Sequence, residues 1–94
     1  MNYIVYCLDH DEMVDKRLSN YDAHKAYLAT SPIKTLVSGP LTALDNQTMI
    51  GSFFLYEADS IEEVQNFINE DPFNRASIWK TIDIRPFLKR VDNR

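Results

Sequence analysis

Hydrophobic and polar positions follow two different periods along this chain, and the order of the periods predicts the order of its elements. Runs rich in β-branched and aromatic residues, which are typical of strands, occupy residues 2–8, 34–41, 49–58 and 78–87. Between them, residues 12–29 and the segment that begins at Ser60 carry apolar residues at helical spacing. The pattern predicts the order β-α-β-β-α-β, the ferredoxin-like α+β arrangement, in which two helices cover one face of a four-stranded antiparallel sheet.

Local residues support the predicted ends of these elements. Pro32 stops the first helix, because proline has no backbone N–H to donate. Ser60 and Glu63 form a capping box at the start of the second helix. Pro86 indicates that the last strand lies at an edge of the sheet, where a missing ladder hydrogen bond is tolerated.

The first and third strands are apolar on both sides, and this predicts a homodimer. Along the first strand two apolar sets alternate, Tyr3, Val5 and Cys7 with Ile4, Tyr6 and Leu8, and residues 50–56 repeat the pattern. Two helices cover only one face of the sheet, so the other face would expose a large apolar patch to water. We expect a second copy of the chain to cover that patch, sheet against sheet.

Composition and charge exclude several classes of protein. Ninety-four residues predict one domain over residues 1–94, and a net charge of −4 argues against a nucleic-acid partner. Cys7 is the only cysteine, so the chain can form no internal disulfide and no cysteine-based zinc site. The longest apolar run is too short to cross a membrane and no signal peptide is recognisable, which predicts a cytoplasmic protein without a membrane partner.

The motifs for bound cofactors and metals are also missing. Only Gly39 and Gly51 are glycine, so there is no glycine-rich phosphate loop or dinucleotide fingerprint, and HExxH does not occur. His10 lies among acidic residues, where a metal site is conceivable but a solvated loop with helix-capping acids is the favoured interpretation. We therefore expect neither cofactor nor metal.

His24 is the stronger candidate for chemistry. Its spacing on the first predicted helix places it in one stripe with Arg17, Tyr21 and Leu28. Because Leu28 and its neighbour Leu18 are expected to face the core, His24 should point toward the sheet or the rim of a cleft beside it. The alternative is a half-buried histidine with a structural role only.

Asp71, at the joint after the second predicted helix, is the natural partner of His24. A carboxylate at a helix C-terminus opposes the helix dipole, so it needs compensation, for which His24, Arg75 and Arg17 are candidates. The two helices lie side by side on one face, which brings His24 within reach. A His–Asp pair fixes the imidazole tautomer and raises its basicity. The alternative is a local turn at Asp71-Pro72.

Other polar groups are expected near such a site. Arg17 could bind an anionic group bidentately, Ser38 could donate a hydrogen bond, and Gly39 could let a ligand approach the backbone closely. Tyr21 supplies a phenol or simply fills core volume. Trp79 is expected to serve in packing or in the dimer interface.

With these residues in view, the chain resembles the YCII family over nearly its whole length. The resemblance rests on several stretches together, "YIVYCLD", an arginine followed by "HKAYL", "SGPL", "GSFFLYEADSIEEV", "DPFNRA" and "IRPF". It implies the fold of the dimeric α+β barrel group and a site histidine and aspartate, which correspond here to His24 and Asp71. Where relatives often have a glycine just after the Asp-Pro segment, this chain has Ala76-Ser77.

The resemblance also implies a class of activity. At least one relative is a dehydrochlorinase that acts on a chlorinated hydroxyquinol, and some are compared with muconolactone isomerase. We therefore expect a cofactor-free lyase or isomerase in which the His24–Asp71 pair removes a proton from a small, cyclic, oxygenated substrate. The alternatives are a homodimer that binds a small molecule without turnover and a structural protein in which the pair only holds the helices together.

Overall fold

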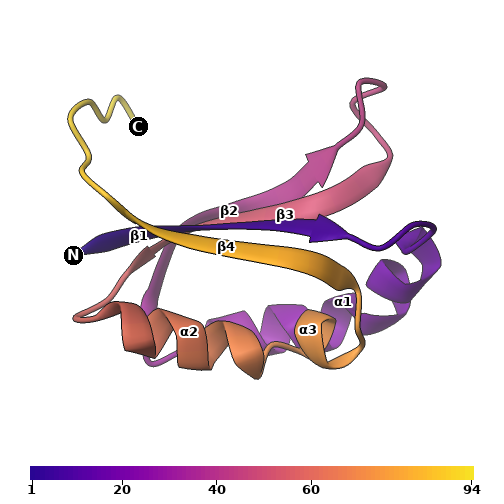
Figure 1. The fold of residues 1–94 in the computed structure, drawn as a ribbon, viewed down its shortest axis with the longest axis horizontal. Helices are drawn as coiled ribbons and strands as arrows, with labels where there is room; N and C mark the ends of the chain where they lie inside the picture. Colours follow the sequence, from indigo (N-terminus) through magenta and orange to yellow (C-terminus); the bar gives the residue numbers. More distant parts are fainter.

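The computed structural model describes all 94 residues and has the predicted order of elements (Figure 1). One further helical turn, which begins at Pro72, follows the second helix. The elements are β1 (Asn2–Asp9), α1 (Val14–Ala29), β2 (Lys34–Thr42), β3 (Met49–Glu57), α2 (Ile61–Asn69), α3 (Pro72–Arg75) and β4 (Trp79–Phe87). The predicted ferredoxin-like α+β fold is confirmed.

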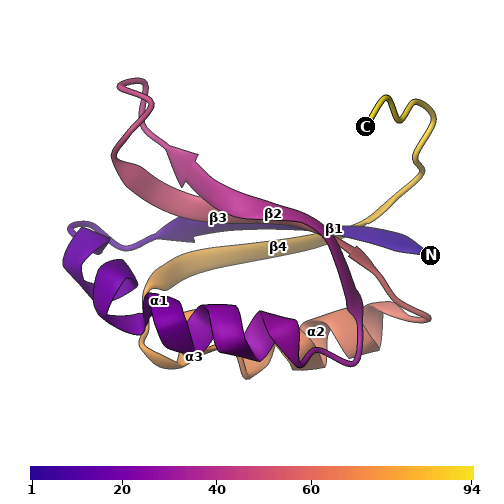
Figure 2. The same cartoon turned by 180° about the vertical axis from the view of Figure 1, so that it is seen from behind.

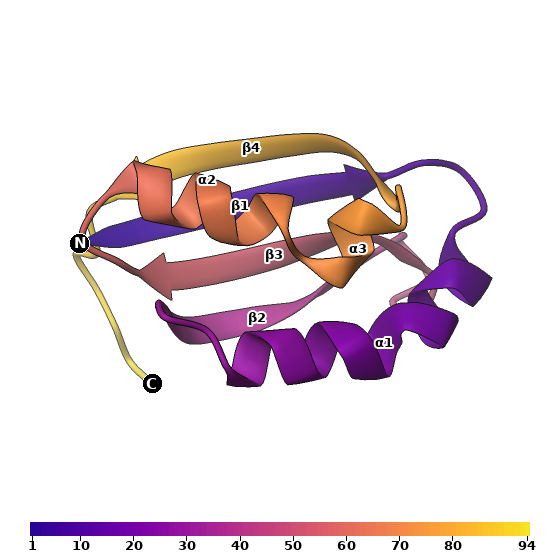
Figure 3. The same ribbon diagram turned by 90° about the horizontal axis from the view of Figure 1, so that it is seen from below.

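The four strands form one sheet in the order β2-β3-β1-β4, and every neighbouring pair is antiparallel. All the helices lie on the same face, and the other face carries no helix (Figures 1 and 2). From the helix side, α1 runs alongside β2, whereas α2 and α3 lie over the middle of the sheet (Figure 3). The order places β2 and β4 at the edges, so the predicted edge position of β4 is confirmed.

Helix ends follow local chemistry. Ser60 Oγ accepts a hydrogen bond from the Glu63 backbone N–H at 3.3 Å, so the Ser60 half of the predicted capping box of α2 is confirmed. The predicted start of the first helix at Glu12 is wrong by two residues. Glu12 has a φ of 58°, which is left-handed and incompatible with a helix, so α1 begins only at Val14.

The core lies between the sheet and the helices. Thirteen buried apolar residues form one cluster, which includes Cys7 and Trp79. Tyr3 and Val5 on β1 face this cluster, whereas Tyr6, which points to the uncovered face, is 41% exposed. Of the two roles considered for Trp79, packing is the one that the structure supports. A second copy of the chain on the uncovered face stays a prediction.

None of the helices combines the length and the apolar character that crossing a membrane requires. A location in the cytoplasm stays a prediction.

Candidate functional site

A cavity of about 490 Å³ opens between α1 and the inner face of β2 and β3. Helix α1 forms one side of the cavity, strands β2 and β3 form the other, and α3 closes one end. The thirteen residues that line it are Arg17, Leu18, Tyr21, His24, Lys25, Leu28, Ser38, Gly39, Pro40, Met49, Ser52, Phe54 and Phe73.

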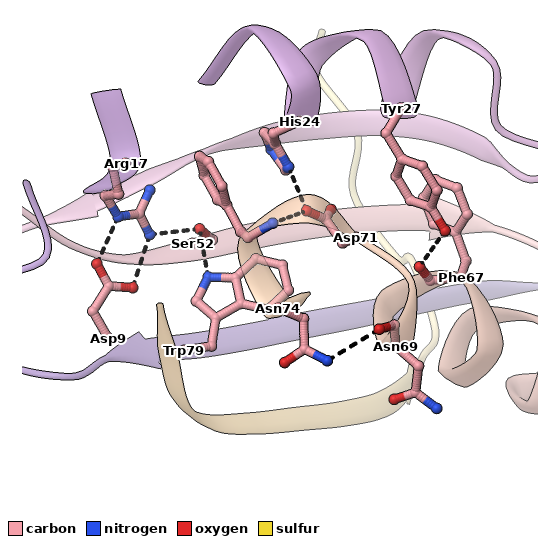
Figure 4. A network of polar contacts seen from close by, with 11 residues as sticks. Asp9, Arg17, His24, Tyr27, Ser52, Phe67, Asn69, Asp71, Asn74 and Trp79 are labelled. Carbon is pink, nitrogen blue, oxygen red and sulfur yellow. Dashed lines mark hydrogen bonds and ion pairs between the residues drawn. The ribbon is translucent and has the colours of Figure 1, made fainter. Parts of the chain in front are cut away.

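His24 and Asp71 are in direct contact at the inner wall of this cavity (Figure 4). The His24 Nδ1 and the Asp71 Oδ1 lie 2.8 Å apart, and the side chains join residues 47 positions apart in sequence. His24 is 8% exposed and Asp71 is fully buried, so the carboxylate lies behind the imidazole as seen from the cavity. The structure thus brings together the two residues that the sequence pointed to.

This contact fixes the tautomer of the imidazole. A carboxylate oxygen only accepts hydrogen bonds, so Nδ1 carries the proton and Nε2 carries the lone pair. Nε2 has no hydrogen-bond partner within the chain, and His24 lines the cavity. The ring is stacked on Phe73 at 4.0 Å between centroids and has an edge contact with Phe54, which hold its plane. A basic nitrogen is therefore presented to whatever occupies the cavity.

The local setting of Asp71 differs from the expectation. Asp71 was expected to oppose the dipole at the end of α2, but it is the N-cap of α3, and its Oδ1 also accepts a hydrogen bond from the Phe73 backbone N–H at 2.9 Å. A negative charge is favourable at a helix N-terminus. Pro72 then occupies the first helical position, where its missing N–H costs nothing. The turn and the contact with His24 are two uses of one carboxylate.

Arg17 has a different role from the one predicted. Its Nε and Nη2 donate to the two carboxylate oxygens of Asp9 at 2.6 and 2.9 Å, and Nη2 also donates to Ser52 Oγ at 2.7 Å. The bidentate side of the guanidinium is therefore occupied by Asp9, which corrects the expectation that it would bind an anionic ligand in that way. Only Nη1 is without a hydrogen bond inside the chain, and Arg17 is among the residues that line the cavity.

One aromatic ring links the two buried polar residues of α1. The guanidinium carbon of Arg17 lies over the Phe73 ring at 5.1 Å from its centroid, and His24 is stacked on the same ring. Arg17 and His24 are separated by two helical turns, about 10.5 Å along the axis, which is enough for a ring between them. Phe73 thus locks α3, and with it Asp71, against α1.

Ser38 and Gly39 both line the cavity, but in different ways. Ser38 pairs with Phe54, whose side chain is in the core, so Ser38 is on the helix-covered face. Gly39 pairs with Phe53, so a side chain there would point to the uncovered face, and a Cβ built on it meets nothing within 4 Å. The glycine is therefore not required for a ligand to approach the backbone from within the cavity.

Two apolar residues of α1 contradict the predicted core. Leu18 is 63% exposed and Tyr21 is 52% exposed, although Leu18 was expected in the core and Tyr21 was considered as core filling. Both line the cavity instead. The reason is that Arg17 and His24 occupy the inward side of the helix, which turns their neighbours toward the cavity and solvent.

Sequence reasoning also missed several residues of the site. Lys25 shares the spacing of Leu18, Tyr21 and Leu28, so a count of helical positions would have found it. Ser52 accepts hydrogen bonds from both Arg17 and Trp79, a role that no local pattern reveals.

Ser77, which follows α3, adopts a φ of 58°. Glycine adopts this left-handed conformation most readily. The resemblance to the YCII family pointed to a glycine in this segment, where this chain has Ala76-Ser77.

Two buried groups near Asp71, Cys7 and Tyr56, have raised pKa values. Burial, and after it the charge of Asp71, raises the pKa of the Cys7 thiol well above its usual range, so Cys7 supplies no thiolate nucleophile. The same two causes raise the pKa of Tyr56. Tyr56 Oη and Asp71 Oδ2 are both buried and have no hydrogen-bond partner in the chain.

The residues present form no cluster of three or more histidine, cysteine, aspartate or glutamate side chains that could bind a metal ion. His10, which was weighed as a metal ligand, is exposed, and its backbone N–H donates to the Ile78 carbonyl at 2.9 Å.

Comparison with known proteins decides the family. The profile of the YCII-related domain matches residues 1–88. The chain belongs to the YCII family. This YCII-family chain is 30% identical to Protein YciI of Escherichia coli O6:H1, an alignment that covers 95% of this chain and 98% of that protein. It is 23% identical to an uncharacterized protein of Haemophilus influenzae over the same shares of the two chains.

One solved structure is similar in both sequence and fold. It is the 5-chloro-2-hydroxyhydroquinone dehydrochlorinase TftG of Burkholderia phenoliruptrix AC1100, in complex with 2,5-dihydroxybenzoquinone. It shares 34% identity with the YCII-family chain at a TM-score of 0.82, and 94% of each chain is covered. The cofactor-independent oxygenase SnoaB of Streptomyces nogalater has a TM-score of 0.57 at 11% identity, with 98% of this chain and 94% of that chain covered, which is a likeness of fold alone.

Proposed function

We propose that this protein is a cofactor-free enzyme of the lyase or isomerase type, in which His24 removes a proton from a small, cyclic, oxygenated substrate. The observation that carries the proposal is the 2.8 Å contact between His24 Nδ1 and a fully buried Asp71, which leaves Nε2 as a base at the cavity wall. The similarity to a dehydrochlorinase that binds a dihydroxybenzoquinone supports the substrate class.

Each group of the site has a task in this mechanism. His24 Nε2 takes the proton, and the imidazolium that forms is stabilised by the Asp71 carboxylate behind it. The electron pair left on the substrate moves toward a ring oxygen or expels a leaving group. Arg17 and Ser38 line the same cavity. In this mechanism the donors that they still have available, Nη1 and the hydroxyl, bind the oxygen that gains negative charge.

The proposal is tested by proton transfer itself. Wild-type protein is incubated in D₂O with 5-chloro-2-hydroxyhydroquinone and with a panel of hydroxyquinols, cyclic enones and lactones. NMR follows deuterium incorporation, and an electrode follows chloride release. For any compound that reacts, we expect His24→Gln to slow the reaction about 10²- to 10⁴-fold, the usual contribution of a general base.

His10→Gln is the matched control, since His10 is the other histidine and is exposed. It should react at the wild-type rate. If ligands bind in the cavity but show no His24-dependent reaction, the protein is a non-catalytic binding protein and the enzyme proposal is wrong. A panel that neither binds nor reacts would favour a structural role for the His24–Asp71 pair.

We also propose that the protein works as a homodimer that joins two uncovered sheet faces. That face carries Tyr6, Phe53 and Val37, of which Tyr6 is 41% and Val37 39% exposed, and such a patch is costly in water. The cavity lies on the other face, so the dimer leaves it open. Sedimentation should give twice the mass of one chain, and Tyr6→Lys should give a monomer; a monomeric wild type would overturn the dimer.

A further inference from the structure

The charge of the cavity lining is opposite to that of the chain as a whole. The chain has a net charge of −4, yet none of the thirteen lining residues is acidic. Three of them, Arg17, His24 and Lys25, are cationic or become so on protonation. A cavity with this lining favours an anion over a neutral or cationic molecule of the same shape.

Lys25 is the lining cation whose charge is not balanced. Arg17 is neutralised by Asp9, and His24 faces Asp71. The chain contains five ion pairs, and Lys25 takes part in none of them. Asp22, three residues earlier on α1, is the acid that helical spacing would offer, but it forms no ion pair with Lys25 either.

On α1, Lys25 lies beside the apolar residues that line the cavity and beside His24, the proposed base. Leu18, Tyr21, Lys25 and Leu28 recur at intervals of three and four residues and so form one stripe along the helix. Tyr21 and Leu28 also belong to the stripe that holds Arg17 and His24, so the two stripes overlap on one side of the helix. Phe54 and Phe73 add aromatic surface opposite. The cavity therefore offers apolar walls to a ring and an ammonium group to a substituent of that ring.

We propose that the substrate is a monocyclic organic anion and that Lys25 binds its anionic substituent, a carboxylate or an ionised hydroxyl. This inference rests on the proposed function, because it names the substrate class of the same site. Lys25 is a specificity-determining residue, which selects charged over neutral rings, whereas His24 performs the proton transfer. Because Lys25 is itself exposed, its attraction for an anion is screened by salt.

The test uses two probes of the same shape and different charge, benzoate and benzamide. Their dissociation constants are measured at low salt by NMR titration of wild-type protein and of Lys25→Met, which keeps the length of the side chain and removes the charge. We expect wild type to bind benzoate about two- to fivefold more tightly than benzamide, and Lys25→Met to bind the two about equally. Lys25→Arg should keep most of the preference.

Lys80→Met is the matched control. Lys80 is an exposed lysine on β4, the edge strand farthest from β2 and the cavity. Replacing it with Met changes the net charge by the same amount as Lys25→Met does. Lys80→Met should leave the preference for benzoate unchanged. If Lys80→Met reduces the preference as much as Lys25→Met does, net charge and not Lys25 sets it, and the assignment is wrong.

The remaining outcomes separate this inference from the proposed function. A wild type without preference for benzoate, or without measurable binding of it, overturns the anionic substrate class. A preference that survives in Lys25→Met overturns the role of Lys25. Neither result affects the His24-dependent deuterium incorporation that tests proton transfer. Conversely, His24→Gln should keep the preference for benzoate while the reaction is lost.

Discussion

Helices α1 and α2 cover the same face of the same sheet, but they bury side chains of opposite character. The buried residues of α2 are Val64, Phe67 and Ile68, all apolar. Those of α1, which is almost twice as long, are Arg17 and His24. Leu18, which is apolar, is exposed on α1. Helix α2 is therefore held by apolar burial, whereas α1 buries paired polar groups and packs apolar residues, Tyr27 and Leu28, that are only partly buried.

Buried apolar and buried charged side chains stabilise a helix in different ways. An apolar side chain gains from leaving water whatever its neighbours are, so the buried residues of α2 act singly. A buried charge is tolerated only with a partner, so those of α1 act as pairs with residues from other elements. Asp9 is on β1, eight residues before Arg17, and Asp71 is before α3, 47 residues after His24.

The largest effect is expected from Arg17→Met. It leaves the Asp9 carboxylate buried without its partner, and the free energy of unfolding should fall by about 3–5 kcal/mol in urea titrations. The double variant Arg17→Met with Asp9→Leu should recover most of this loss, because both charges are then gone. If the double variant is as unstable as the single one, α1 does not depend on pairing.

Ile68→Ala tests α2. Ile68 is 1% exposed, and its truncation should lower the free energy of unfolding by about 2–5 kcal/mol through lost burial and a cavity. No second substitution should restore it, which distinguishes it from Arg17→Met. The dissociation constant of a cavity ligand should stay at its wild-type value in the folded fraction; a tenfold change would show that α2 also shapes the site.

His24→Leu is the intermediate case. Asp71 keeps only the hydrogen bond from the Phe73 backbone, and the loss of its second donor should cost about 1–3 kcal/mol. Adding Asp71→Asn keeps the cap and removes the buried charge, so the double variant should return to within about 1 kcal/mol of wild type. Such recovery would indicate that the pair is kept for function. A lasting deficit of several kcal/mol would make it structural.

Leu18→Ala should have the smallest effect on stability. Leu18 is 63% exposed, so the change in the free energy of unfolding should be within about 0.5 kcal/mol. Because Leu18 lines the cavity, the affinity for a cyclic ligand should nevertheless fall. A stability loss as large as that of Ile68→Ala would show that Leu18 behaves as a core residue, as the sequence predicted.

Sequence patterns were enough to predict the fold and the two central residues of the candidate site. Strand-like runs and helical spacing are local signals, and a β-α-β-β-α-β order leaves few ways to pack the elements. That order brings the end of α2 beside α1, which was enough to pair His24 with Asp71. The resemblance to the YCII family pointed to the same two residues.

The hydrogen-bond partners of the polar groups in the candidate site could not be predicted before the fold was known. Arg17 was expected to be free for a ligand and is held by Asp9, Leu18 leaves the core, and Asp71 caps α3 instead of ending α2. Local pattern assumes that apolar residues mark the buried side of a helix. On α1 that side is set instead by carboxylates of other elements, and the contacts between them exist only once the chain has folded.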